Sequence, residues 1–259
     1  MTRYEAIFRR KSVRKYRDDA VEEQILERIR DFGREALEIR SGICMKWKIY
    51  RASDHKVRGM FQVKAPYYAA LYAEDCEDSY IQAGCLMQQV VLYLHTQGIG
   101  SCYQGGARLK KEEESGNMKL MMILAFGYPA ESLERTRSEF KRAEPGKLVK
   151  ASVPPGKAQK KLLESARLAP SALNQQPWRF VVTENRIHLF TRRPGKIGYE
   201  RQYGKYMFHA GIVLSHMLLT AEEYWFDLEY RKLDSIMEKA IQNYLYAGSV
   251  IIANGSMKT

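Results

Sequence analysis

The sequence predicts a protein of mixed helices and strands that is built as two similar halves. Two apolar helical segments, 81–100 and 208–226, carry Ala-Gly at the same position and apolar residues at matching offsets after it. Upstream of each of them, a helical segment is followed by a strand candidate. Because both pairs keep the same order at similar spacing, a tandem duplication explains the chain better than chance similarity.

The leading element of each half is a helix joined to a strand. Residues 25–38 and 162–175 both begin with two aliphatic residues and a glutamate, and both predict a helix in their first part. The strand candidates 45–52 and 177–184 follow these helices and alternate with a period of two.

The second helix of the first half has the clearest pattern. Its apolar residues recur at i, i+3, i+4 and i+7, and they are Ala83, Leu86, Met87, Val90 and Leu94. Asp78 or Ser79 is expected to cap the start of this helix and Gly98 its end. Residues 121–130 then predict a buried strand that ends at Gly127 and Pro129.

The segment 144–157 is rich in Pro, Gly and Lys and is the predicted connector. We expect one half in residues 1–146 and the other in residues 147–259, together forming one compact unit. The halves have diverged, since only the second has the polar loop APSALNQQPW (169–178) and only the first has the glycine run at 98–101. Such complementary loss is expected when a two-fold dimer with two composite sites is fused and keeps one site.

The composition is that of a soluble globular protein. The 259 residues (30.0 kDa) are 45% hydrophobic and 28% charged, which is enough to bury a sizeable core. No apolar run approaches the roughly 18 residues that span a bilayer, and the charged N-terminus carries no export signal. We expect a cytoplasmic protein without a membrane partner, with reduced thiols at Cys44, Cys76, Cys85 and Cys102.

The net charge of +12 is spread evenly along the chain. Residues 1–150 carry 27 Lys and Arg against 21 Asp and Glu, and residues 151–259 carry 15 against 9, so each part has a net charge of +6. A basic tail for DNA or RNA would make this distribution lopsided, and aromatic residues are not interleaved with the basic ones. We therefore expect no nucleic-acid partner and keep nucleic-acid binding as a remote alternative.

The chain opens with FRRKSVRKYRDD, a local concentration of donors. Arg10, Lys11, Ser12 and Arg14 place guanidinium, ammonium and hydroxyl groups within five residues. This combination can surround a phosphate dianion with charge-assisted hydrogen bonds. The competing interpretation is a solvated basic turn before a helix that starts near Val21.

The run QGIGSCYQGG (97–106) does not fit a dinucleotide-binding fingerprint. The third glycine of that fingerprint would fall at Tyr103, and the run follows a predicted helix instead of a strand. The run is better explained as a helix stop followed by a glycine-rich loop. The backbone N–H groups of such a loop can approach a flat ligand. The basic pair Lys141 and Arg142 follows later and is either a further anion contact or plain surface charge.

Side chains for acid–base, nucleophilic or metal chemistry do not form recognisable motifs. The five histidines do not pair with cysteines or carboxylates at metal-ligand spacing, so no metal site is expected. His209 and His216 flank one helix, where packing or solvent exposure is the favoured interpretation. The sequence offers hydrogen-bond donors for a phosphate and a glycine-rich loop, but no nucleophile motif. This combination indicates that a bound cofactor performs the chemistry.

Taken together, these segments resemble the FMN-dependent nitroreductase family. The resemblance lies in RRKSVRKY, in AGCLMQQVVLYLHTQGIGSCYQGG, in FGYP with a following basic residue, and in APSALNQQPW. It implies an α+β fold in which each half has a helix-flanked, mainly antiparallel sheet. The polar loop, which in the family comes from the partner subunit, here follows the FGYP segment in the same chain. This order implies a single-chain, pseudo-dimeric form.

The resemblance also implies roles for individual residues. Arg10, Ser12 and Arg14, with Lys11 alongside, would contact the FMN phosphate and the flavin edge, and Arg142 with Lys141 would be the later phosphate ligands. Gly105 and Gly106 would lie near flavin N5, with the Gly105 backbone closest and no catalytic side chain. The loop contacts would be Pro170, Ser171, Asn174 and Gln176. Residues 52–64 stay unassigned, with Arg58 as a candidate flavin contact.

The resemblance implies an NAD(P)H oxidoreductase that reduces nitroaromatics, quinones or similar electron-poor small molecules through flavin N5. NADH or NADPH would be the donor, and the two half-reactions would alternate at one place. A degenerate family member that binds flavin or nothing, as a sensor or scaffold, is the alternative. We expect a monomeric pseudo-dimer and leave further homodimerisation open.

Overall fold

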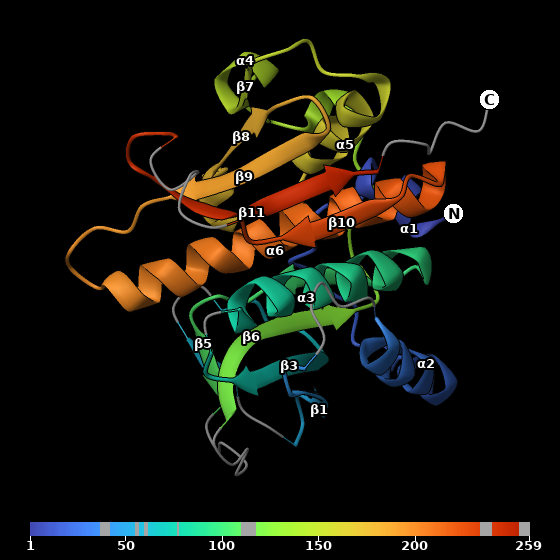
Figure 1. Cartoon of the computed structure of the whole chain (residues 1–259). Coiled ribbons are helices and arrows are strands. Elements are labelled where there is room, and N and C mark those ends of the chain that lie inside the picture. The colour runs from blue at the N-terminus through green and yellow to red at the C-terminus, as the bar shows by residue number, and fades with distance from the viewer. Residues whose placement is uncertain are drawn as a thin grey trace. The chain divides into compact units, whose positions relative to one another are not determined.

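The computed structural model describes residues 1–36, 42–54, 57–59, 62–76, 78–109, 118–233 and 240–253. The chain divides into two compact units, Met1–Glu139 and Phe140–Thr259 (Figure 1). The sequence placed this boundary at residue 146, so Lys141 and Arg142, expected in the first half, lie in the second unit.

The first unit combines helices, a main sheet and a short ribbon. Its helices are α1 (Arg3–Ile7), α2 (Glu23–Glu35), α3 (Ser79–Thr96) and the 3-10 turn η1 (Arg137–Glu139). Its strands are β1 (Met45–Arg51), β2 (Val57–Gly59), β3 (Tyr67–Glu74), β4 (Gly100–Tyr103), β5 (Ala107–Leu109) and β6 (Met118–Gly127).

The main sheet of the first unit has the strand order β1-β3-β6-β4, and every neighbouring pair is antiparallel. β3 is buried over seven of its eight residues, as expected of a central strand covered on both faces. One face of the sheet packs with Val57 and Leu109 of the β2–β5 ribbon in a single apolar cluster. α3 contacts β3, β4 and β6 (Figure 1).

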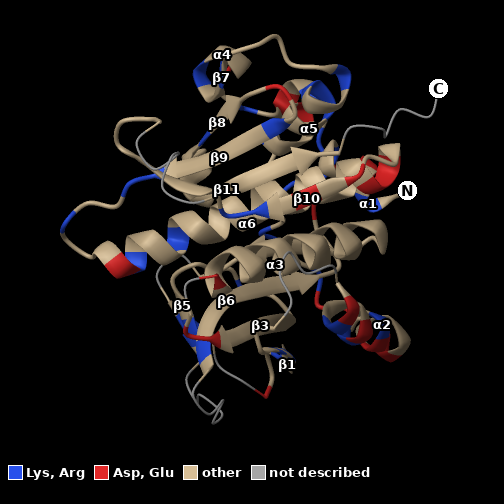
Figure 2. Ribbon diagram, in the orientation of Figure 1, with Lys and Arg blue, Asp and Glu red and all other residues tan. Residues whose placement is uncertain are grey.

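Local sequence explains the limits of the unit's helices. α3 begins after Asp78, whose side chain makes no capping bond, and ends before Gly98, which adopts a φ of +75°. The Gly98 stop confirms the sequence prediction, because a left-handed residue after a helix favours glycine. α2 is amphipathic, with Leu26 and Ile29 buried and charged residues of both signs on its outer face (Figure 2).

The second unit has its own sheet and helices. Its helices are α4 (Pro145–Leu148), α5 (Lys157–Arg167), α6 (Tyr199–Tyr224) and the 3-10 turn η2 (Ala172–Asn174). Its strands are β7 (Val149–Ala151), β8 (Trp178–Val182), β9 (Arg186–Arg192), β10 (Leu228–Arg231) and β11 (Tyr244–Ile252).

The second sheet repeats the order of the first. Its strands lie in the order β10-β11-β9-β8-β7, so β8, β9, β11 and β10 correspond to β1, β3, β6 and β4. These four strands pair antiparallel, as their counterparts do, while β7 adds a parallel edge strand beside β8. The helices also correspond, since α5 precedes β8 as α2 precedes β1, and α6 follows β9 as α3 follows β3. This topology agrees with two tandem half-repeats.

Two sequence predictions need correction in the second unit. The segment 144–157, predicted as a connector, contains α4 and β7, because Leu148 is buried and β7 pairs with β8. α6 begins at Tyr199, nine residues before the predicted segment, since its first turn is exposed and lacks an apolar face. Across the described part of the chain, no helix combines the length and apolarity needed to cross a membrane.

A glycine in β11 is required by close packing. Gly248 lies at the irregularity between β11 and β9, with a φ of +145°. A Cβ added there would lie 2.3 Å from Cε2 of Tyr230, whose hydroxyl donates to the Ala247 carbonyl. We expect Gly248→Ala to lower the free energy of unfolding by about 2–4 kcal/mol, through backbone strain and overpacking.

Chemical denaturation measures this loss against a matched control. Gly146 lies in α4 with no heavy atom within 4 Å of an added Cβ, so Gly146→Ala should be neutral or stabilising. Equal stabilities of the two variants would contradict the role given to Gly248.

Candidate functional site

The basic N-terminal segment, residues 9–17, runs antiparallel to residues 128–135. Arg135 N–H donates to the Arg9 carbonyl (2.8 Å), Ala130 N–H to Lys15 (3.0 Å), and Arg17 N–H to Tyr128 (2.9 Å). Isolated bridges at Arg10–Glu134 and Tyr16–Pro129 complete the pairing. Backbone hydrogen bonds therefore fix the segment that the sequence singled out, and it is not a free basic turn.

The same segment is held on its other side by β4. Val13 N–H donates to the Ser101 carbonyl (3.0 Å), and Ser12 forms a parallel bridge with Ser101. A Cβ added at Gly100 would lie 2.7 Å from Cγ2 of Val13. Gly100 is therefore a glycine of close packing, and the glycine run serves the N-terminal segment here.

Arg10 is the most unusual side chain of this region. It is 5% exposed, and its Nη2 donates to the Ser12 hydroxyl (3.1 Å). Among the described residues, no carboxylate forms an ion pair with Arg10. Burial lowers the pKa of its guanidinium, and the nearby Arg14 lowers that pKa further. An arginine buried without a counter-charge is costly.

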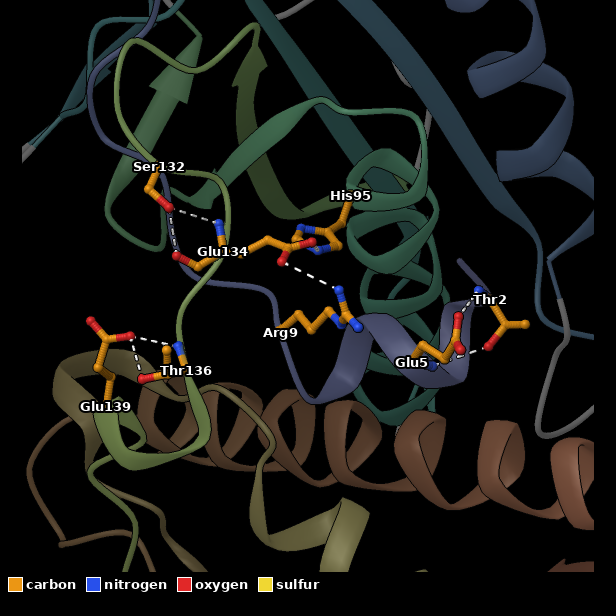
Figure 3. A network of polar contacts seen from close by, with 8 residues as sticks. All are labelled: Thr2, Glu5, Arg9, His95, Ser132, Glu134, Thr136 and Glu139. Carbon is orange, nitrogen blue, oxygen red and sulfur yellow. Dashed lines mark hydrogen bonds and ion pairs between the residues drawn. The ribbon is translucent and has the colours of Figure 1, made fainter.

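The buried charge of Arg10 affects the pKa values of two neighbouring basic groups, Arg135 and His95. Burial and then Arg10 lower the pKa of Arg135 to about 10. Burial, Arg10 and Arg9 lower the pKa of His95 to about 4, so its ring is neutral at neutral pH. Figure 3 shows the carboxylate that partly offsets this charge, since Glu134 lies 3.6 Å from Arg9 and 3.8 Å from His95.

The donor groups of Arg10, Lys11, Ser12 and Arg14 fit a bound anion with several oxygens. Arg10 and Ser12 already lie within hydrogen-bond distance of each other, Lys11 is half-buried beside them, and Arg14 is exposed. An oxyanion would supply the charge that the buried guanidinium lacks and accept hydrogen bonds from these donors. Four of the predicted site residues thus lie in one short segment.

The glycine loop follows the strand on which the N-terminal segment rests. Gly105 and Gly106 form an exposed turn directly after β4, and an added Cβ at Gly105 would meet no atom within 4 Å. Gln104, buried beneath the turn, accepts from Val63 N–H at 2.9 Å through its side chain. The loop is thereby anchored while its glycines stay open to a ligand.

The polar loop of the second unit is bound to the basic pair that precedes it. Arg142 Nη1 donates to Asn174 Oδ1 (2.8 Å), and its Nη2 donates to the Leu168 carbonyl (3.0 Å). Asn174 Nδ2 donates in turn to the Lys141 carbonyl (2.7 Å). Residues predicted separately, as a phosphate ligand and as a loop contact, are thus direct partners.

Gln176 and Ser171 close the loop on itself. Ala143 N–H donates to Gln176 Oε1 (2.8 Å), and Gln176 N–H donates to the Ser171 hydroxyl (2.9 Å). Leu173, Asn174 and Gln176 all have left-handed backbones, with φ of 52°, 54° and 48°. Non-glycine residues in this region are strained, and such strain clusters at functional sites.

Sequence reasoning missed His209, which supports the loop from α6. The ring is 5% exposed, and its Nε2 accepts from Ala172 N–H at 3.2 Å. Burial and then Lys205 lower its pKa to about 3, so the ring is neutral with its hydrogen on Nδ1. Nδ1 has no hydrogen-bond partner among the described residues. A single histidine on a helix carries no pattern that would reveal this role.

The remaining candidates are placed as follows. Pro170 is half-buried at the start of the polar loop, and Arg58 is exposed in β2. His55, one of the five histidines for which no metal site was expected, lies outside the described residues. Within the described ranges, no group of three or more His, Cys, Asp or Glu side chains could hold a metal ion.

Solved structures place the fold in a known class. A structure titled as a "putative nitroreductase" from Thermotoga maritima is 25% identical, with a TM-score of 0.66, and the match covers 97% of this chain and 93% of that one. A nitroreductase family protein from Clostridium difficile 630 is 19% identical over 57% of this chain and 96% of its own, with a TM-score of 0.46. The fold is the α+β, nitroreductase-like fold that the sequence predicted.

A family model identifies the family itself. The model described as "Putative TM nitroreductase" matches residues 2–221. The chain therefore belongs to this nitroreductase family. An FMN-dependent nitroreductase from Clostridium difficile R20291 also matches, at 20% identity over 54% of this chain and 96% of its own, with a TM-score of 0.40. A search of curated proteins found no match.

The first prediction for this site concerns the order of the polar loop. Arg142→Lys keeps the charge but removes the fork that reaches Asn174 and Leu168. We expect amide hydrogens of residues 172–176 to exchange about tenfold faster, because about 1.5 kcal/mol of charge-assisted bonding is lost. Hydrogen exchange with mass spectrometry measures this, and Arg186→Lys, at the exposed start of β9, is the control. Unchanged exchange would contradict the anchoring role.

The second prediction concerns His209 and pH. Its pKa in the folded chain lies below the value of 6.5 for an unperturbed histidine, so below pH 6.5 the unfolded chain binds the extra proton. The free energy of unfolding of the wild type should therefore fall as the pH is lowered. Its slope should exceed that of His209→Gln by up to about 1.4 kcal/mol per pH unit. Urea unfolding between pH 7 and pH 4.5 tests this, since His95 and His188 contribute to both proteins alike. Parallel pH profiles would refute it.

Proposed function

We propose that this chain is an FMN-dependent NAD(P)H oxidoreductase that reduces nitroaromatics, quinones or similar electron-poor small molecules. Membership of a nitroreductase family supports the general class. The cofactor, the donor and the acceptors are the proposal.

The observation that carries the proposal is the buried Arg10. Its guanidinium is 5% exposed and has a hydroxyl, not a carboxylate, as its hydrogen-bond acceptor within the described structure. A phosphate monoester dianion would offset the cost of this burial and bind the Arg10 fork. Ser12 would donate its hydroxyl to the same phosphate, and Lys11 would add a further positive charge.

The remaining first-unit residues would serve the ring end of the cofactor. Ser12 pairs with Ser101, and the run from Ser101 to Gly105 spans about 13 Å at the rise of an extended strand. The Gly105 backbone N–H would then donate to flavin N5, with Gly106 leaving room for the ring. Arg14, exposed near Ser12, would stabilise negative charge on the reduced cofactor.

By the family resemblance, the polar loop of the second unit is a further proposed group of FMN contacts. Pro170, Ser171, Asn174 and Gln176 form a loop whose strained backbone is held by hydrogen bonds. Arg142, with Lys141, orders this loop and adds positive charge beside it. The proposal assigns one FMN to each chain, because one N-terminal phosphate segment and one polar loop are present.

Bound FMN would supply hydride transfer at N5, taking hydride from NADH or NADPH and passing it to the acceptor. The chain's own residues bind, orient and stabilise charge. His95 and His209 have pKa values of about 4 and 3, so neither is assigned as a proton donor at neutral pH.

The test separates phosphate binding from ring binding. We expect Arg10→Ala to raise the dissociation constant of FMN more than about tenfold, because a desolvated charge-assisted contact to phosphate is lost. Binding of riboflavin, which lacks the phosphate, should change less than about twofold. Fluorescence titration of the apoprotein measures both ligands, with Ser12→Ala expected to show a smaller effect of the same kind.

The control is Arg28→Gln, an exposed arginine of α2 that donates only to the Gln24 carbonyl in the described structure. Equal FMN affinity in wild type and Arg10→Ala would refute the phosphate assignment. The flavin absorbance of the purified protein and its bleaching by NADH or NADPH test the activity. Retained FMN that neither donor reduces would favour the non-catalytic family member.

A further inference from the structure

The β2–β5 ribbon carries two arginines directly opposite each other. Its register pairs Val57 with Leu109, Arg58 with Arg108, and Gly59 with Ala107. Val57 and Leu109 are buried in the apolar cluster of the first unit. Because side chains alternate along a strand, the next pair, Arg58 and Arg108, points away from that cluster, and both arginines are exposed.

Two like charges in this position are unfavourable without a counter-ion. Side chains directly opposite on antiparallel strands have Cβ atoms about 4.5–5.5 Å apart, and like charges there are destabilising. Over the described ranges of the chain, the side chains of Arg58 and Arg108 form no hydrogen bond or ion pair. An oxyanion placed between the two guanidinium groups would turn this repulsion into two sets of charge-assisted hydrogen bonds.

The ribbon is continuous with the glycine loop. A Cβ added at Gly59 would lie 2.6 Å from the Gly106 carbonyl oxygen, so the two backbones touch. Ala107, opposite Gly59, donates its N–H to the Gln104 carbonyl (3.0 Å) at the base of the turn. The arginine pair therefore lies two residues beyond Gly106, the last residue of the turn proposed to face the reactive part of the cofactor.

From this placement we propose that Arg58 and Arg108 bind the oxyanion, phosphate or carboxylate, of a small molecule that exchanges electrons at the glycine loop. This inference rests on the proposed function. Phosphate would come from the NADPH or NADH donor, and carboxylate from an anionic acceptor. The pair would then select anionic partners over neutral ones of the same redox chemistry.

Kinetics with paired substrates test the inference. Wild type, Arg58→Gln, Arg108→Gln and the control Arg28→Gln are compared with NADPH, NADH, 4-nitrobenzoate and nitrobenzene. We expect each ribbon variant to lower kcat/KM about tenfold for at least one anionic partner, and by less than about twofold for nitrobenzene. Loss with NADPH alone identifies the 2′-phosphate, equal loss with both donors identifies the pyrophosphate, and loss with 4-nitrobenzoate identifies an acceptor carboxylate. The inference is overturned if the ribbon variants lower kcat/KM no more than Arg28→Gln does. It is also overturned if they lower kcat/KM for nitrobenzene as much as for the anionic partners.

A binding measurement separates this inference from the proposed function. Calorimetry of the purified chain with 2′,5′-ADP and with 4-nitrobenzoate needs no turnover. Weaker binding of either probe by both ribbon variants supports the arginine pair even if the chain retains no FMN, which would refute only the proposed function. If FMN is bound and reduced but wild type binds neither probe, or all variants bind both equally, only the arginine pair is refuted.

Discussion

The burial of the Arg10 guanidinium is the constraint on which the first unit depends. A charged side chain reaches such a position only when the backbone around it is fixed. The antiparallel pairing with residues 128–135 and the contact of Val13 with Gly100 provide that fixation. Burial, and after it the charge of Arg10, lowers the pKa of both Arg135 and His95. A positive centre of this kind favours an anion over any neutral ligand.

The second unit solves a different physical problem. Three left-handed residues store strain in the polar loop. Arg142, which donates to Asn174, and the side chains of Gln176 and His209, which accept from backbone N–H groups, hold that strained backbone in place. Strained backbone persists only where its surroundings over-determine it. The loop is therefore held in one conformation, and a ligand bound there would not have to supply the entropy of ordering it.

Much of the fold follows from local sequence, while the contacts that build the site do not. Helical periodicity and Gly98 defined α3, and alternation predicted β1 and β8 close to their observed bounds. The apolar stretch 121–130 predicted β6, which begins three residues earlier and ends at Gly127. α6 was predicted too short because its first turn is exposed and has no apolar face. β7 was missed, since three residues in a Pro- and Gly-rich stretch become a strand only by pairing with β8.

Long-range pairing accounts for the rest of the difference. The proximity of Arg10 and Ser12 follows from adjacency in the chain, but their enclosure by residues 101 and 128–135 leaves no periodic pattern. The bond between Arg142 and Asn174 joins positions 32 residues apart, and the Ala172–His209 bond joins positions 37 apart. Polar contacts of this kind are specified by geometry that only the folded backbone supplies.

The pairing of residues 9–17 with residues 128–135 has a consequence for synthesis of the chain. During synthesis, residues 9–17 remain without their pairing partner until residues 128–135 have emerged from the ribosome. Both segments lie within Met1–Glu139, so the hydrogen bonds of this pairing involve no residue of the second unit. The backbone enclosure of Arg10 therefore requires nearly the full length of the first unit, and a chain that ended before residue 128 would lack it.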